Sequence, residues 1–290
     1  MSGNPLHAPY YADHAAQCST RIVENVRVAR DTFRVRFSAP LIATTAVPGQ
    51  FAMLRLGGCN DPLIARPLAV YNVGDGEFVD LVYLVKGKFT SRLATLGPGT
   101  PLVVWGPLGN GFSSTPTEHL IMVAGGIGQT PFLLLGEEFR GLRKFGGTQR
   151  SITPAKQVTL LYGARSQDWL AGLSDFARTG VAVQIATDDG SCGFHGFVTQ
   201  LLEKTLDEHA LASAAPPRVV CCGPEPMMAA VARIAKERNV PCEVSLETPM
   251  ACGIGICYTC VAKVCLDNGE WDYKRTCVEG PIFPAEKIVW

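Results

Sequence analysis

Residues 120–142 read LIMVAGGIGQTPFLLLGEEFRGL, and this stretch decides the fold. An apolar run of strand length leads into a group of glycines, and the residues after them have helical periodicity. A strand, a glycine loop and a helix in this order predict an α/β unit whose loop approaches a phosphate or a ring closely. The loop, Gly125 to Pro131, does not read G-x-G-x-x-G, so it does not indicate the standard Rossmann fingerprint.

The region that follows repeats the alternation of strand and helix. Apolar strands are expected at 158–164, 181–187 and 218–223, and helices at 197–206 and 225–238. Strands that are apolar throughout and alternate with helices indicate a parallel sheet that is covered on both faces. We therefore predict a nucleotide-binding α/β domain over residues 117–244.

The chain before this domain has the pattern of an all-β fold. Short runs such as RIVENVRVA (21–29) and TFRVRF (32–37) are broken by Gly and Pro, with no helical period between most of them. Strands at this spacing predict a small antiparallel barrel over residues 19–116. One short helix is expected at 91–96, and residues 1–18 are expected to form a flexible tail.

The C-terminal region is rich in cysteine and glycine. Cys252, Cys257 and Cys260 have the spacing C-x4-C-x2-C, and Cys277 follows after a gap of sixteen residues. This is the spacing of plant-type [2Fe–2S] sites, in which four thiolates hold two irons. The alternatives are a structural zinc site or scattered buried thiols, but zinc ribbons use paired C-x2-C knuckles and this region has only one such pair. We predict a small [2Fe–2S] domain over residues 245–290, with these four cysteines as the metal ligands.

Two features of the predicted barrel indicate a flavin site. Arg66 precedes Pro67 at the end of a strand, where its guanidinium can clamp a diphosphate and the extended backbone after it can line a flavin ring. The strand from Leu81 to Val85 runs into Gly87 and the short helix, whose free N–H groups can bind a pyrophosphate. Each feature taken alone also fits an ordinary strand edge or turn.

Two further motifs follow strands of the α/β domain, at the edge where ligands bind in open sheets. Cys222-Gly223-Pro224 ends the strand at 218–223, and Cys222 is either a group near a bound nicotinamide or a plain buried thiol. The sequence TDDGS at 187–191 also follows a strand, and it is either part of the site or an ordinary acidic turn.

The composition excludes several classes of partner. Lys plus Arg and Asp plus Glu both total 26 in 290 residues, so no net field attracts nucleic acid or an anionic membrane, and neither is expected as a partner. No apolar window has the pattern of a membrane span, and the first residues lack that of a signal peptide. We therefore expect a cytoplasmic location, in which eleven cysteines stay reduced and serve metal or redox chemistry.

Together the motifs resemble those of the ferredoxin–NADP reductase superfamily: RPLA at 66–69, GGIGQTP at 125–131 and CGP at 222–224, in this order. With TDDGSCGFHGFVT (187–199) and ACGIGICYTC (251–260), the chain looks like the electron-transfer subunits of NAD-linked, heterotetrameric dihydroorotate dehydrogenases. The resemblance covers nearly the whole chain from about residue 19. It implies FAD, NAD(H) and a [2Fe–2S] cluster as cofactors, the FMN-containing catalytic subunit as partner, and a role in pyrimidine biosynthesis.

The resemblance also assigns cofactor contacts residue by residue. FAD contacts fall on Arg66, Pro67, Leu68, Ala69, Tyr83, Leu84, Val85, Gly87, Phe89 and Thr90, and nucleotide contacts on Gly125, Gly126, Gly128, Thr130, Gly223 and Pro224. Cys222 lies near the nicotinamide in this assignment and is the candidate catalytic residue. Ala69 stands where relatives usually carry Ser, and Phe89 where they often carry Gly, so the flavin contacts at these two positions are expected to differ.

By the same likeness, a hydride passes from NADH to FAD, and single electrons then pass through the cluster to the FMN of the partner. Arg165 and Ser166 end a strand as a 2′-phosphate site would, but the resemblance implies NAD rather than NADP. Two alternatives stay open. One is the flavin subunit of an NADH-dependent ferredoxin:NADP oxidoreductase or of a sulfide dehydrogenase, and the other is a non-catalytic redox sensor that uses the cluster as a switch.

Overall fold

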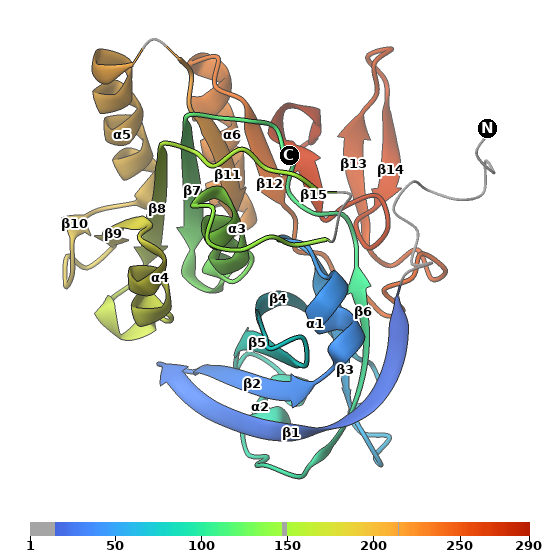
Figure 1. Cartoon of the computed structure of the whole chain (residues 1–290). Coiled ribbons are helices and arrows are strands. Elements are labelled where there is room, and N and C mark those ends of the chain that lie inside the picture. The colour runs from blue at the N-terminus through green and yellow to red at the C-terminus, as the bar shows by residue number, and fades with distance from the viewer. Residues whose placement is uncertain (1–14, 147–149, 214) are drawn as a thin grey trace.

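The computed structural model describes residues 15–146, 150–213 and 215–290, so residues 1–14 of the predicted tail lie outside the described part. Figure 1 shows a β-barrel below a sheet with helices, and a C-terminal hairpin beside them. The predicted fold class, an antiparallel barrel followed by a parallel-sheet α/β domain and a small C-terminal domain, is confirmed.

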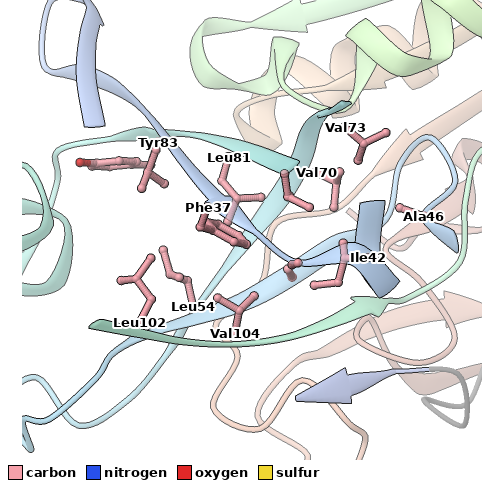
Figure 2. Packing of buried hydrophobic residues seen from close by; sticks show 14 of the residues in the cluster. Phe37, Ile42, Ala46, Leu54, Val70, Val73, Leu81, Tyr83, Leu102 and Val104 are labelled. Atoms are coloured by element: carbon pink, nitrogen blue, oxygen red, sulfur yellow. The ribbon is translucent and has the colours of Figure 1, made fainter. Parts of the chain in front are cut away.

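Six antiparallel strands close the barrel in the order β1-β2-β5-β4-β3-β6. They are β1 (Ala16–Ala29), β2 (Thr32–Ser38), β3 (Phe51–Leu56), β4 (Arg66–Gly74), β5 (Phe78–Leu84) and β6 (Pro101–Leu108). β1 begins three residues before position 19, because Ala16 pairs with Gly106 and thereby extends the ladder with β6. Alternate residues point into the barrel, and Figure 2 shows Phe37, Leu81 and Val104 packed against one another from three strands, each fully buried.

Two short helices lie against the barrel, α1 (Pro40–Thr45) and α2 (Lys88–Leu93). The helix that the sequence predicts at 91–96 therefore begins three residues earlier. The reason lies in its first turn, where the hydroxyl of Thr90 accepts hydrogen bonds from the N–H groups of Lys86 at 2.9 Å and Gly87 at 3.1 Å. These bonds stabilise the start of a helix in the way a capping side chain does.

Seven strands form the sheet of the second domain, in the order β10-β9-β8-β7-β11-β12-β15. They are β7 (His119–Gly125), β8 (Gln157–Ala164), β9 (Ala182–Thr187), β10 (Phe194–His195), β11 (Arg218–Cys222), β12 (Cys242–Ser245) and β15 (Ile282–Pro284). All neighbours are parallel except β15, which pairs antiparallel with β12. The C-terminal segment therefore returns to the edge of this sheet, although the sequence places residues 245–290 in a domain of their own.

Helices cover both faces of the sheet. On one face Leu120 and Met122 of β7 pack with α3 (Phe132–Phe139) and α4 (Leu173–Thr179). On the other face Ile121 and Val123 pack with α5 (Val198–Ala212) and α6 (Glu225–Glu237). The central strand is apolar at every position because both of its faces are buried.

The remaining elements are short. η2 (Gly126–Gln129) and η4 (Gln167–Trp169) follow β7 and β8, and η5 (Ala285–Lys287) follows β15. β13 (Val261–Cys265) and β14 (Trp271–Arg275) form the antiparallel C-terminal hairpin. Among the described residues, no helix combines the length and the apolar character that a membrane crossing needs.

Candidate functional site

The four cysteines of the predicted cluster lie together as two pairs. Cys252 lies beside Cys257, and Cys277 lies beside Cys260, close enough in each pair to change the pKa of a thiol. Within the ranges that the structure describes, no three His, Cys, Asp or Glu side chains gather around one point as the ligands of a single metal ion do. Two pairs of thiols match the ligands of a two-iron cluster, which needs four cysteines.

Hydrogen bonds make two of these thiols acidic. Thr259 donates its hydroxyl to Sγ of Cys257 at 3.2 Å, and this bond and the backbone N–H of Thr259 lower the pKa of Cys257 to about 6. The hydrogen bond from Cys277 lowers the pKa of Cys260 to about 6 and raises that of Cys277. Because the thiolate is the form that binds metal, this loop is suited to ligate iron. The assignment of the four cysteines as ligands stays a prediction.

The cluster loop, residues 251–260, packs directly on the wall of the barrel. Gly253 has a φ of +73°, and a Cβ at this position would lie 2.6 Å from Cγ of Met53 and 3.0 Å from Cδ1 of Leu108. The N–H of Ile254 points to Sγ of Cys252 at 3.4 Å. The glycine thus allows both the left-handed turn that directs an amide at sulfur and the close contact with the barrel.

Apolar side chains join the barrel and the cluster loop into one buried group. Cys260 and Cys277 are 2% and 1% exposed, and they pack in this group with Phe51, Met53, Ala65, Leu108, Met250 and Val278. Met53 on β3 pairs with Pro67 on β4. The strand that the sequence assigns to the flavin is therefore separated from the cluster loop by a single strand.

Arg66 begins that strand and is exposed. Its Nη1 donates to the backbone carbonyls of Ile64 and Ala65, both at 3.1 Å, and no carboxylate in the described part of the chain pairs with it. Its charge is available to a diphosphate, as the prediction requires. Seven other positions can present backbone or side-chain atoms to the flavin: Pro67, Leu68, Ala69, Leu84, Val85, Gly87 and Thr90. Their contacts with it stay predictions.

Two of the predicted flavin contacts have their side chains inside the barrel. Tyr83 and Phe89 are each 1% exposed. Tyr83 stacks on Phe33 with ring centroids 5.8 Å apart and donates its hydroxyl to Oδ1 of Asn25 at 3.0 Å. Only the backbone at these two positions can therefore reach a flavin. The N–H groups of Lys86 and Gly87 are likewise engaged, because they bind Thr90.

The glycine loop after β7 and the Cys222 motif after β11 meet at one edge of the sheet, where Ala124 pairs with Cys222. The chain runs from β7 through β8 to β10 on one side and returns to β11 on the other. β7 and β11 therefore flank the point at which the strand order reverses, which is where open α/β sheets bind their ligands.

The glycines of the two loops have different roles. A Cβ on Gly128 would lie 2.2 Å from the carbonyl oxygen of Cys222, and one on Gly125 would lie 2.7 Å from Cδ of Pro224. Because they lack a Cβ, these two glycines let the two loops pack on each other. Gly223 does the same, since a Cβ there would meet Met227 and the backbone of Gly125. Gly126, with a φ of +55°, faces open space and leaves room for a ligand. The side chain of Thr130 is buried.

Cys222 is partly exposed at this edge. Burial raises its pKa to about 12, although the neighbouring Ser245 hydroxyl opposes the shift. The side chain is therefore a neutral thiol at physiological pH. Its placement beside a nicotinamide stays a prediction.

Comparison with known proteins places these features in a family. The model for the iron–sulfur cluster binding domain of dihydroorotate dehydrogenase B matches residues 247–289, and the oxidoreductase NAD-binding domain matches residues 122–233. The dihydroorotate dehydrogenase B (NAD(+)) electron transfer subunit of Desulforamulus reducens is 38% identical over 265 residues, which cover 91% of this chain and 94% of that protein. The chain belongs to this family.

A second member, from Shouchella clausii, is 35% identical over 92% of this chain and 96% of its own length. Among solved structures, the NADH-dependent reduced ferredoxin–NADP oxidoreductase has a TM-score of 0.75 at 28% identity, covering 93% of this chain and 90% of that one. A ferredoxin NADP+ reductase from Neisseria gonorrhoeae shares the fold, with a TM-score of 0.61 at 16% identity over 76% of this chain and 91% of that one. The family resemblance that the motifs indicated is confirmed.

Two residues beside the cluster loop were not identified from the sequence. Met53 contacts Gly253, and Trp105 of β6 donates its indole N–H to the carbonyl oxygen of Cys252 at 2.9 Å. Neither residue lies in one of the sequence motifs that indicated the family. The second contact joins positions 147 residues apart, which local patterns do not reveal.

Proposed function

We propose that the chain carries electrons between NAD(H) and the FMN-containing catalytic subunit of a dihydroorotate dehydrogenase, in pyrimidine biosynthesis. FAD would lie along β4 of the barrel, NAD(H) at the carboxyl edge of β7 and β11, and a [2Fe–2S] cluster in the loop of residues 251–260. One observation carries the proposal: the loop with three of the four cysteines packs on the barrel wall, one strand away from the candidate flavin strand.

The side chains present fit these cofactors. Arg66 offers an exposed guanidinium to a diphosphate, and the acidic thiols of Cys257 and Cys260 suit iron. Gly126 leaves space for a dinucleotide at the sheet edge. The FAD-bound reductase of Neisseria gonorrhoeae, which shares the fold, supports a flavin in the barrel.

When bound, FAD accepts two electrons as a hydride and releases them singly, and a [2Fe–2S] cluster takes one electron at a time. The chain's own part is alignment and exclusion of water. Close packing of Gly128 on Cys222 fixes the two nucleotide loops relative to each other. The apolar group of Met53, Leu108, Cys260 and Cys277 keeps water out of the space between barrel and cluster.

The outer side of the cluster loop supports transfer to a protein partner. Cys257 is exposed, and its neighbours Ile256 and Tyr258 are 67% and 65% exposed. An iron held there would lie near the surface, as a one-electron exchange with another subunit requires. None of the eleven cysteines forms a disulfide, which supports a cytoplasmic location, where cysteines stay reduced.

A second candidate is the flavin subunit of an NADH-dependent ferredoxin–NADP oxidoreductase. The solved structure of that name, at a TM-score of 0.75, favours it. The curated relatives at 31–38% identity, which cover at least 90% of this chain, favour the first candidate more strongly because they share more of the sequence.

The decisive test is reconstitution. The chain is produced together with the FMN-containing dihydroorotate dehydrogenase of the same genome, and NAD+-dependent oxidation of dihydroorotate is measured with and without it. We expect the two proteins to co-purify, the reaction to require both, and kcat/KM to be higher for NADH than for NADPH in the reverse direction. Two results together would refute the assignment: the complex fails to form, and the chain with a different partner reduces ferredoxin in a reaction that depends on NADPH.

A further inference from the structure

Trp105 on β6 connects the barrel to the cluster loop. Its indole N–H donates to the carbonyl oxygen of Cys252 at 2.9 Å. In the part of the chain that the structure describes, this is the one side-chain hydrogen bond between the barrel and residues 251–260. The donor stands on a rigid strand and the acceptor is the backbone of a predicted iron ligand.

The indole ring is itself held in place. Trp105 is half-buried and packs against the apolar group that contains Met53, Leu108 and Cys260. On β6 it pairs with Met53 of β3, which in turn pairs with Pro67 of β4. Trp105, Met53 and Pro67 therefore form a row across three adjacent strands, from the cluster loop to the candidate flavin strand.

Other contacts also hold the loop to the barrel wall, but they are less directional. Gly253 meets Met53 and Leu108 through van der Waals contact, which restricts approach without fixing orientation. A hydrogen bond prefers a linear donor geometry and therefore fixes the carbonyl of Cys252 more narrowly. The thiol of Cys252 lies two bonds from the Cα of that residue, so fixing this backbone limits the sulfur to the few positions that its rotamers allow.

We propose that Trp105 is a positioning residue, which holds Cys252 at a fixed spacing from the flavin strand and so sets the rate of electron exchange between flavin and cluster. This rests on the proposed function, because it presumes that both cofactors bind. Trp105 does not touch a reacting atom in this proposal. It acts through the loop backbone.

The test compares Trp105→Phe with Trp271→Phe in the flavin- and cluster-loaded chain. Trp105→Phe keeps a ring and removes the N–H donor. Trp271 lies on β14, is 50% exposed and contacts Lys263 and Tyr273, away from the barrel. We expect the amides of residues 251–255 to exchange hydrogen about fivefold faster in Trp105→Phe, the effect of losing one neutral hydrogen bond. Electron transfer from NADH-reduced flavin to the cluster, followed by rapid mixing, should be slower in that variant and unchanged in Trp271→Phe.

Equal exchange and equal transfer rates in the two variants would overturn the proposal. Trp105→Ala also removes the ring and should release iron to a chelator faster than Trp105→Phe, and if it fails to fold, the Phe variant still decides. A wild-type chain that binds neither flavin nor iron would overturn the proposed function itself, which separates the two failures.

Discussion

The contact between the cluster loop and the barrel predicts a large effect of one methyl group at Gly253. In Gly253→Ala, the new Cβ would lie 2.6 Å from Cγ of Met53 and 3.0 Å from Cδ1 of Leu108. The φ of +73° adds the cost of a left-handed conformation, about 1–2 kcal/mol for a residue with a Cβ. Overpacking of a tight site adds about 1–3 kcal/mol. The native loop should lose about 2–5 kcal/mol in all.

Gly269→Ala is the matched control. Gly269 lies in the turn of the β13–β14 hairpin with a φ of +85°, and a Cβ there would meet no atom within 4 Å. This substitution has the free-energy cost of a left-handed backbone conformation, but its new Cβ does not clash with any neighbouring atom. The difference between the two variants isolates the steric contribution of about 1–3 kcal/mol, which corresponds to about a 5- to 140-fold change in the population of the open loop.

The assay is cluster loss. Each loaded variant is mixed with an iron chelator in mild urea, and the visible absorbance of the cluster is followed, while released flavin is measured by fluorescence. Gly253→Ala should lose iron at least fivefold faster than Gly269→Ala, with flavin release the same in both. Equal rates of iron loss would refute the reasoning that the loop depends on this contact with the barrel.

Three further predictions follow from other parts of the chain. Cys277→Ser should abolish the cluster but leave the flavin content and the NADH-dependent bleaching of the flavin intact, whereas Cys265→Ser should retain cluster and flavin. Iron analysis and visible absorbance measure this, and a Cys277→Ser variant that still holds a cluster would contradict the ligand assignment. Arg66→Ala should weaken FAD binding by about 10- to 140-fold, the effect of losing a hydrogen bond to a charged group, and fluorescence titration against wild type would expose an unchanged Kd. His119 is buried, and burial and the nearby His209 lower its pKa to about 4. The same histidine in the unfolded chain takes up a proton near pH 6.5, so the free energy of unfolding should fall as the pH drops from 6.5 towards 4, by about 2 kcal/mol between pH 7.5 and 5. Urea unfolding should show this loss in the wild type and a smaller loss in His119→Gln. An equal loss in the two proteins would contradict the prediction.

The parts of the fold that depend on local pattern were predicted from the sequence. The apolar run before Gly125 predicts a strand buried on both faces, and β7 is such a strand. The spacing of Cys252, Cys257 and Cys260 predicts that their sulfurs converge. For β7, neighbours in the sequence are neighbours in space, so its period contains the information. The convergence of the three sulfurs on one cluster stays a prediction.

The features that depend on distant contacts were not predicted. Tyr83 was assigned to the flavin, but Leu81 and Tyr83 share the inward face of β5, so its side chain lies in the barrel core. Gly128 was assigned to a nucleotide, but the absence of a Cβ is required by the carbonyl of Cys222, 94 positions away in the chain and adjacent only because β7 and β11 are neighbours. The hydrogen bond of Trp105 to Cys252 has no local signal at all.

The most direct test of the proposed electron path is electron paramagnetic resonance of the isolated, flavin- and cluster-loaded chain after anaerobic addition of NADH. We expect the flavin to bleach and the spectrum of a reduced [2Fe–2S] cluster to grow in the same sample, whereas Cys277→Ser should show the bleaching alone. A chain whose flavin is reduced by NADH while its cluster stays oxidised, although a small redox mediator poised with NADH reduces that cluster readily, would show that the loop on the barrel wall does not receive electrons from the flavin.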